Sequence, residues 1–231
     1  MALVDLDPRA DLTSYLGLLP APGQPTIYES LFGDGPAPAH LLHPLAPEGL
    51  GAIPASPNLV GAEMLLMQSP AAQRFARSTA KLQSLSEVAE YILLDSPPGL
   101  QMLSLCALSA AREVLIPQQC SFLALHGLRQ ITENVERMRQ TNPALRLTGI
   151  LLTMQDRRTV HNRQVIGMVR EAFGQVVFKT VIPLSVRYQE AAAAGQPICL
   201  YAPRSAQAEA YAALAEELVR RRAPSGGEGA A

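Results

Sequence analysis

Aspartates follow apolar segments of the sequence at two places. Asp5 and Asp7 close the opening segment Met-Ala-Leu-Val, and Asp95 closes the apolar run Tyr91-Ile92-Leu93-Leu94. Ligands of open α/β sheets bind beyond the carboxyl ends of the strands, so these side chains are placed to form a site. Magnesium prefers oxygen ligands, keeps several waters and is often held through one carboxylate, and a second carboxylate orients an attacking water. The pattern therefore indicates a hydrated magnesium ion beside a phosphate chain.

A second interpretation of these aspartates stays open from the residues alone. A lone Asp-x-Asp more often caps the next helix or lies solvated in a turn. The motif around Asp95 is sharper, because four apolar residues followed by Asp-x-Pro-Pro resemble a metal-coordinating strand that leads into a mobile switch loop.

The elements that must position these residues alternate along the chain. Strands are expected at residues 2–5, 50–54, 91–94, 113–117, 147–153 and 176–182, and helices at 26–32, 58–67, 71–88, 100–111, 125–138, around 165–172 and at 205–222. Near-continuous apolar strands between amphipathic helices predict an α/β fold, a parallel doubly wound sheet covered by helices on both faces. We expect one domain over residues 1–222 and a disordered tail over 223–231.

Composition excludes several classes of protein. The 231 residues carry 19 basic and 20 acidic side chains, so any contact with nucleic acid must come from a local patch. Three cysteines without close pairing argue against a disulfide framework or a structural zinc site. Neither an apolar run long enough to cross a bilayer nor a secretory signal is evident, so we expect a cytoplasmic protein.

The order of the motifs resembles the ParA/Soj group of chromosome and plasmid partition ATPases, of the MinD/ParA deviant-Walker class, over about residues 2 to 222. The matching segments are Val4-Asp5-Leu6-Asp7-Pro8, Thr13-Ser14-x-Leu16-Gly17-Leu18, Ile92-Leu93-Leu94-Asp95-Ser96-Pro97-Pro98, Gly149-Ile150-Leu151-Leu152-Thr153-Met154-x-Asp156-x-Arg158-Thr159 and Val181-Ile182-Pro183-x-x-Val186-Arg187. The resemblance implies a P-loop NTPase-like fold that uses ATP and Mg²⁺.

The resemblance also implies a role for each matching carboxylate. Asp7 would orient or activate the water that attacks the γ-phosphate, and Asp5 would sit behind it near the metal. Asp95 would hold magnesium through water. The switch segment would follow it as Ser96, Pro97, Pro98 and Gly99.

Further matching residues would contact the base and DNA. Thr153, Met154 and Pro183 would border the adenine, and Arg158 and Arg187 correspond to arginines that contact DNA phosphates without reading sequence. Exposed arginines are commonly only solvated, but weak contacts add usefully when a nucleotide-driven dimer presents two sets. The implied protein is a nucleoid-associated homodimer that binds nonspecific DNA with ATP and whose hydrolysis is stimulated by a ParB-type centromere-binding partner.

A membrane-surface role, as in the related division-site ATPases, is not expected. The apolar face of the C-terminal helix is mostly alanine, which is too small to anchor in lipid. The three arginines that end this helix, 220–222, are interpreted as a solvated terminus that complements the helix dipole.

The family's phosphate loop, Lys-Gly-Gly-x-Gly-Lys-Thr-Thr, has no counterpart in the 231 residues. It should lie about thirty residues before Asp5, and neither Lys81 nor Lys179, the two lysines, follows a glycine-rich turn. The missing strand would lie beside the one that ends at Asp95, so two strand edges are expected without a neighbour. We expect an N-terminally truncated reading frame that is inactive as given. The alternative is a nonhydrolysing ParA homologue that binds DNA or protein.

Overall fold

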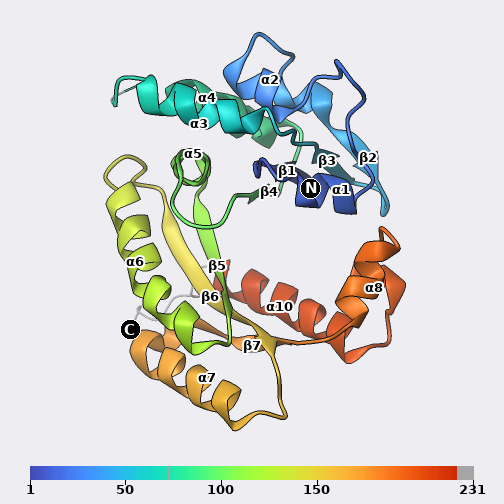
Figure 1. Ribbon diagram of the computed structural model, residues 1–231, viewed down its shortest axis with the longest axis vertical. Coiled ribbons are helices and arrows are strands. Elements are labelled where there is room, and N and C mark those ends of the chain that lie inside the picture. Colours follow the sequence, from blue (N-terminus) through green and yellow to red (C-terminus); the bar gives the residue numbers. More distant parts are fainter. Residues whose placement is uncertain (72, 223–231) are drawn as a thin grey trace, which may run out of the picture. The chain divides into compact units, whose positions relative to one another are not determined.

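The structure is a computed structural model that describes residues 1–71 and 73–222 (Figure 1). The chain divides into two compact units. The first contains Met1–Arg112 and Asn134–Leu145, and the second contains Glu113–Glu133 and the chain from Arg146 onward. Each unit has a sheet of its own.

The first unit has a four-stranded sheet in the order β2-β3-β1-β4. Its elements are β1 (Ala2–Asp5), α1 (Asp11–Tyr15), α2 (Ile27–Phe32), the 3₁₀ helix η1 (Pro38–Leu41), β2 (His43–Leu45), β3 (Leu50–Ile53), α3 (Leu59–Gln68), α4 (Ala76–Gln83), the 3₁₀ helix η2 (Ser84–Glu87), β4 (Ile92–Asp95) and α5 (Met102–Ala110). β1 runs parallel to β3 and β4, and β2 is an antiparallel edge strand.

Helices α2, α3 and α4 lie together on one side of β1, β3 and β4 (Figure 1). The core under them joins Val4 of β1 and Ile53 of β3 to side chains of α2, α3 and α5. α2 begins with a capping box in which Thr26 and Glu29 satisfy each other's backbone N–H groups. The sheet that carries the two aspartate motifs is thus stabilised by the helices that pack on one of its faces.

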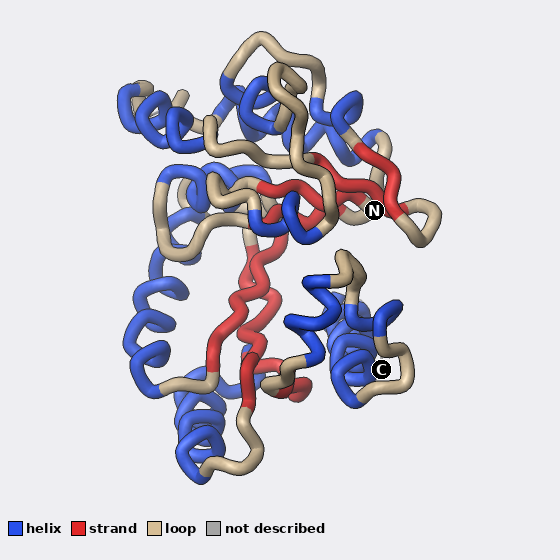
Figure 2. Tube along the Cα trace, turned by 45° about the vertical axis from the view of Figure 1, so that its right-hand side comes forward, coloured by secondary structure: helices blue, strands red, loops and turns tan. Residues whose placement is uncertain are grey.

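The second unit has a parallel three-stranded sheet in the order β5-β6-β7 (Figure 2). Its elements are β5 (Glu113–Gln119), α6 (Phe122–Met138, whose last turn counts with the first unit), β6 (Arg146–Gln155), α7 (Val160–Phe173), the 3₁₀ helix η3 (Gly174–Val176), β7 (Val177–Pro183), α8 (Arg187–Ala193), α9 (Ile198–Tyr201) and α10 (Ala206–Arg222).

Alternating residues of β6 supply the cores on the two faces of this sheet. Ile150 and Leu152 pack with α6 and α7, whereas Leu151 packs with Phe178 against α8 and α10. Gly149 lies where a β-carbon would come within 2.4 Å of the Phe178 ring, so the absence of a side chain there allows this close packing. The second sheet is therefore covered on both faces by helices of its own unit.

The predicted fold class is confirmed, since parallel strands alternate with flanking helices. The predicted strands all occur, but the expected helix over 71–88 begins at Ala76 and ends in a 3₁₀ turn. The short elements β2, α1, α8 and α9 were not predicted. The tail over 223–231 lies outside the described residues, and the single-domain interpretation of residues 1–222 stays a prediction.

The apolar spacing of α10 predicts a buried face formed by Tyr211, Ala215, Leu218 and Val219, and this prediction is wrong. Tyr211 and Val219 are exposed, and the buried residues of this helix are Ala208 and Glu217. The predicted solvated terminus also needs correction, because Arg221 is half-buried and paired. On α7 the apolar spacing predicts a buried face that contains Val165, Met168 and Val169. Val165 and Val169 are buried, but Met168 is exposed.

Among the described residues each sheet has two edge strands, β2 and β4 in the first and β5 and β7 in the second. The two edges expected beside the missing strand are those of β4 and β5. The outer face of β4 leaves Leu93 51% exposed, which is high for an apolar residue in a parallel strand. Across residues 1–71 and 73–222, no helix combines the length and the apolar character needed to cross a bilayer.

Candidate functional site

The two aspartate motifs meet at one end of the first sheet. β1 and β4 are neighbouring parallel strands in which Asp5 is the register partner of Asp95, and Leu6 N donates to Asp95 O at 2.7 Å. Asp7 lies two residues past Asp5 at the same end. The convergence expected from the sequence is present in the structure.

Asp5 is 1% exposed and uses both carboxylate oxygens within the protein. Its Oδ1 accepts from Asp7 N at 3.0 Å, and its Oδ2 accepts from Thr13 N at 2.9 Å and Thr13 Oγ1 at 2.7 Å. Thr13 Oγ1 in turn accepts from Ala55 N at 2.8 Å, just past β3. Asp5 therefore stabilises the loop between β1 and α1 and fixes the position of the Asp7 backbone.

Asp7 is 6% exposed and faces a basic neighbour. Its Oδ1 accepts from Arg9 N at 2.9 Å, and Arg9 Nε lies 3.4 Å from its Oδ2. The Arg9 guanidinium also pairs with Asp11 at 3.1 Å and is largely exposed. Because this contact to Oδ2 is long and its arginine is solvated, the ion pair between Arg9 and Asp7 is weak.

Asp95 differs from its neighbours because, within the described residues, no hydrogen bond holds its carboxylate. Partial desolvation, followed by the negative charges of Asp5, Asp7 and Asp11, raises the pKa of Asp95 to about 6. A cation beside it would relieve this repulsion. The side chain keeps access to solvent, as binding through a metal-bound water requires.

The segment after Asp95 leaves the sheet as a loop. Pro97 is buried, whereas Ser96 and Pro98 are exposed. Gly99 has a φ of 84°, a left-handed conformation that favours glycine. Ser104 Oγ of α5 donates to Pro97 O at 2.9 Å, so the loop is tied to the helix that follows it.

The predicted adenine-bordering residues lie together at the ends of two neighbouring strands of the second unit. Thr153 and Met154 are among the last residues of β6, and Pro183 ends β7 as the register partner of Gln155. Leu184 N donates to Gln155 O at 2.9 Å and closes the end of the sheet. Met154 is 52% exposed with a φ of 54°, and non-glycine residues held in this region cluster at functional sites.

The two predicted DNA-contacting arginines follow the same strand ends. Arg158 and Arg187 are both exposed. Arg158 forms a two-pronged pair with Asp156, through Nε and an Nη group at 3.0 Å each, which lowers the pKa of Asp156. Arg187 begins α8, and its backbone N donates to Ser185 Oγ.

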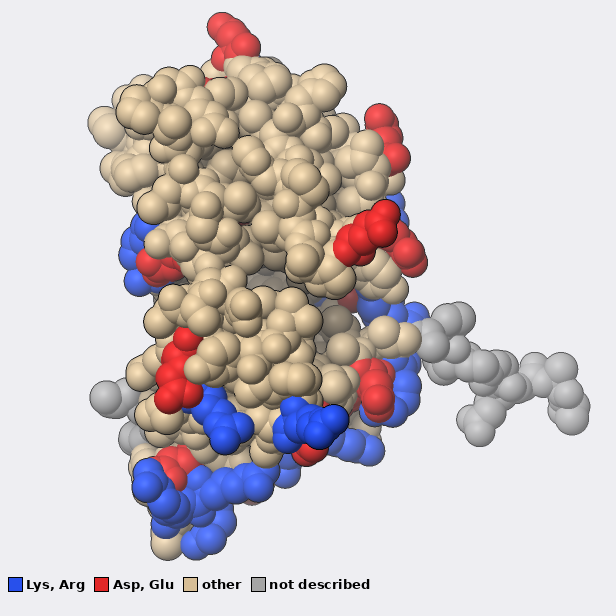
Figure 3. Space-filling view, turned by 90° about the vertical axis from the view of Figure 1, so that its right-hand side faces the viewer, with Lys and Arg blue, Asp and Glu red and all other residues tan. Residues whose placement is uncertain are grey.

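Basic side chains concentrate in the second unit. Most of the 19 lysines and arginines belong to it. Figure 3 shows them gathered over its elements on the face that it displays, whereas the first unit has few there.

Neither lysine is placed to cradle a phosphate. Lys81 Nζ donates to Ser30 O, at the carboxyl end of α2, and Lys179 is exposed within β7. The residues therefore do not fit a triphosphate by themselves. In the described part of the chain no three His, Cys, Asp or Glu side chains are grouped as direct ligands of a metal ion. A magnesium ion held through its waters would not need such a group.

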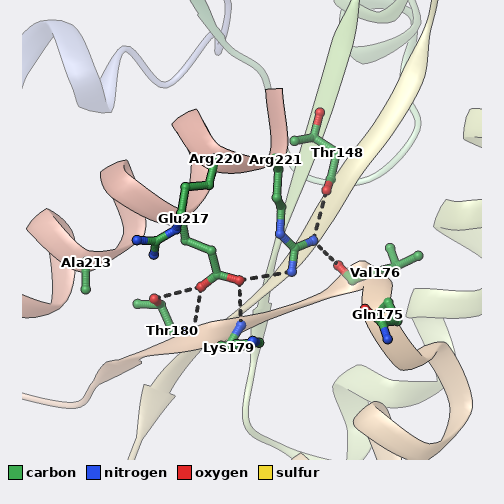
Figure 4. Close-up of a pocket in the computed structure, with 9 residues that line it drawn as sticks. All are labelled: Thr148, Gln175, Val176, Lys179, Thr180, Ala213, Glu217, Arg220 and Arg221. Carbon is green, nitrogen blue, oxygen red and sulfur yellow. Dashed lines mark hydrogen bonds and ion pairs between the residues drawn. The ribbon is translucent and has the colours of Figure 1, made fainter. Parts of the chain in front are cut away.

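A cavity of about 660 Å³ in the second unit contains none of the predicted site residues (Figure 4). Its central pair is Glu217 and Arg221 of α10. Glu217 accepts from Lys179 N, Thr180 N and Thr180 Oγ1, and Arg221 donates to Val177 O at 2.8 Å. The guanidinium also lies 4.0 Å from the centroid of the Phe178 ring. These groups close the free edge of β7.

The sequence reasoning assigned no role to Thr13, the residue that links Asp5 to β3. Thr13 belongs to a matching motif, but its partner at Ala55 lies 42 residues away and leaves no local signal. For Glu217 the signal was misleading, because a charged residue on a helix normally indicates the solvated face.

Two family models match the chain. The model described as "AAA domain" matches residues 1–147, and the model described as "4Fe-4S iron sulfur cluster binding proteins, NifH/frxC family" matches residues 104–225. Among curated proteins, the chromosome partitioning protein ParA of Myxococcus xanthus is 42% identical over 96% of this chain and 78% of its own length. The sporulation initiation inhibitor protein Soj of Bacillus subtilis is 40% identical over 94% of this chain and 85% of its own.

The chain is also similar to several solved structures. McdA of Cyanothece superposes with a TM-score of 0.80 at 25% identity, covering 94% of this chain and 86% of that one. Cobyrinic acid a,c-diamide synthase of Mycobacterium smegmatis, solved also with ADP and magnesium, superposes with a TM-score of 0.79 at 32% identity, covering 95% and 81%. The cell division ATPase MinD of Pyrococcus furiosus, at 22% identity and a TM-score of 0.71, shares the fold.

Proposed function

Because the chain belongs to the ParA/Soj family of chromosome-partitioning ATPases, we propose that it serves DNA partition through the carboxylate site of its first unit. The observation that carries the proposal is the meeting of Asp5, Asp7 and Asp95 at one end of the sheet. The complete cycle would be ATP-dependent dimerisation, nonspecific DNA binding on the nucleoid, and hydrolysis stimulated by a ParB-type partner in the cytoplasm.

Each carboxylate has a distinct part in this proposal. Asp95 would accept hydrogen bonds from magnesium-bound water, and Asp5 would contribute its negative charge while it braces the loop through Thr13. Asp7 would hold and orient the attacking water. Magnesium bound there supplies charge neutralisation along the phosphate chain. Thr153, Met154 and Pro183 are proposed to border the adenine.

The test joins a segment that carries the phosphate loop of a ParA/Soj relative to the amino end of this chain. We expect magnesium-dependent ATP hydrolysis by the fusion and none by the 231-residue chain. Asp7→Ala should abolish turnover in the fusion, since orientation of the water is lost, whereas Asp34→Ala, an exposed carboxylate, should not. If the 231-residue chain hydrolysed ATP by itself, and Asp7→Ala abolished that hydrolysis, the phosphate loop would not be needed.

A second candidate is a nonhydrolysing homologue that binds DNA or protein. The observation that favours it is the placement of both lysines, since Lys81 bonds to the end of α2 and Lys179 lies within a strand. A fusion that folds, binds DNA without ATP and never hydrolyses it would select this candidate.

A further inference from the structure

Glu63 of α3 caps a different helix, α5. Its Oε2 accepts a hydrogen bond from Met102 N at 2.9 Å, and its Oε1 accepts from Leu103 N at 3.0 Å. Gln101, the N-cap residue of α5, makes no capping bond with its own side chain. The unpaired N–H groups and the positive end of α5 are thus satisfied by a carboxylate from outside the helix.

This cap lies at the far end of the switch segment. β4 ends at Asp95 and α5 begins at Met102, so residues 96–101 connect two fixed points. The first point is held by the pairing of β4 with β1. The second is held by Glu63, on a helix whose Leu59 and Leu66 are buried in the core.

A cap from α3 does more than a local cap would. An Asp or Ser at position 101 would cap α5 through Leu103 N or Ser104 N but would leave the helix free to shift against α3. Glu63 satisfies the donors and also ties the two helices together. Because Ser104 of α5 bonds to Pro97 O, a shift of α5 would be passed on to the segment itself.

We propose that Glu63 is a positioning residue for the switch segment Ser96–Gly99. By holding the first turn of α5 on α3, it sets where the segment rejoins the folded unit and limits the positions open to the chain after Asp95. The inference rests on the proposed function, because the position of the switch segment is important only if Asp95, which precedes it, holds the metal. Glu63 acts only through α5.

The test uses the 231-residue chain without nucleotide and compares Glu63→Ala, Glu63→Gln and Glu29→Ala. Amide hydrogen exchange reports on Met102 and Leu103, and ¹⁵N relaxation reports on Ser96, Gly99 and Leu100. Glu63→Ala should speed exchange at the two amides about tenfold, since a charge-assisted bond is lost at each. The order parameters of the segment should fall from about 0.85 toward about 0.6.

Glu63→Gln retains one acceptor and the shape of the side chain, so it should fold and give intermediate values. Glu29→Ala removes another carboxylate cap of the same unit, the one on α2, and should leave residues 96–103 unchanged. Unchanged order in the segment of both Glu63 variants would overturn the proposal.

A rescue variant separates capping from positioning. Adding Gln101→Asp to Glu63→Ala should restore slow exchange at Leu103 but not the order of the segment, because the link to α3 stays broken. Restoration of both would show that Glu63 is a cap and nothing more. None of these readouts needs hydrolysis, so their failure is distinct from failure of the proposed function.

Discussion

The three carboxylates at the end of the first sheet differ in what holds them. Asp5 is surrounded by donors from Asp7 and Thr13, which stabilise its charge. Asp95 has no such donors among the described residues, and partial burial together with the charges of Asp5 and Asp7 raises its pKa. Such unfavourable placement of a charge is typical of a binding site that a cation completes.

Removing the charge of Asp95 should stabilise the protein. We expect Asp95→Asn to raise the free energy of unfolding at pH 8, because repulsion and partial desolvation are relieved. Solvent screening of this exposed side chain limits the gain to about 0.5–1 kcal/mol. Urea denaturation measures the change, and Glu90→Gln is the exposed control. A variant no more stable than the wild type would show that the repulsion is already screened.

The hydroxyl group of Thr13 should contribute to the stability of the first unit. Thr13→Val keeps the shape but removes the hydroxyl, which leaves Ala55 N without its acceptor and Asp5 without one donor. The expected loss is about 1–3 kcal/mol, the cost of an unsatisfied buried group, measured by urea denaturation. Thr141→Val, at an exposed site, should cost little. Equal losses in both variants would contradict the bracing role of Thr13.

At the scale of elements, α10 shows how a sheet edge is closed without another strand. Its Glu217 accepts the N–H groups of Lys179 and Thr180, and its Arg221 donates to carbonyl groups of β6 and β7. The helix therefore replaces strand pairing with a carboxylate and a guanidinium. This closure blunts an edge that would otherwise be open to pairing with other chains.

The contribution of Glu217 should depend on pH. Burial tends to raise the pKa of its carboxyl, but hydrogen bonds from Lys179 N, Thr180 and Arg221 outweigh burial and lower it. A folded-state pKa below the unfolded value stabilises the protein above the unfolded pKa, and this is lost as pH falls through the folded pKa.

Glu217→Gln should therefore be less stable than the wild type at pH 7, by about 1–3 kcal/mol, because an amide nitrogen cannot accept. The difference should shrink as pH falls below about 4. Thermal unfolding between about pH 3 and pH 7 measures it, and the exposed neighbour Glu216→Gln is the control. A pH-independent difference would assign the effect to packing.

At the scale of the whole molecule, the carboxylate site and the two arginines proposed to bind DNA belong to different units. Asp5, Asp7 and Asp95 lie in the first unit, and Arg158 and Arg187 lie in the second. The proposed function uses both, because it assigns nucleotide binding to the carboxylates and DNA binding to the arginines. With a near-neutral net charge overall, the proposed DNA binding by one copy would be weak.

Exchanging both arginines should weaken DNA binding for all sequences alike. In the ATP state of the fusion with a phosphate loop, Arg158→Ala with Arg187→Ala should lower affinity and reduce the slope of log K against log salt by about 1 for each arginine–phosphate pair that is removed. The matched control is Arg137→Ala with Arg139→Ala, exposed residues of the first unit. Unchanged retention of DNA would remove the assignment.

The sequence by itself determined the alternation of strands and helices and the convergence of Asp5, Asp7 and Asp95. Apolar runs that end in aspartate are local patterns, and parallel pairing brings their ends together. It also showed that the 231 residues hold no glycine-rich, lysine-bearing phosphate loop.

Only the tertiary structure decided what holds those residues in place. The bonds from Glu63 to Leu103, from Glu217 to Lys179 and from Thr13 to Ala55 join residues 38 to 42 positions apart. Residue type and spacing carry no record of such partners, since a buried glutamate that caps a distant backbone has the same local pattern as a solvated one. Packing decides which carboxylates are exposed to solvent and which form hydrogen bonds that stabilise the fold.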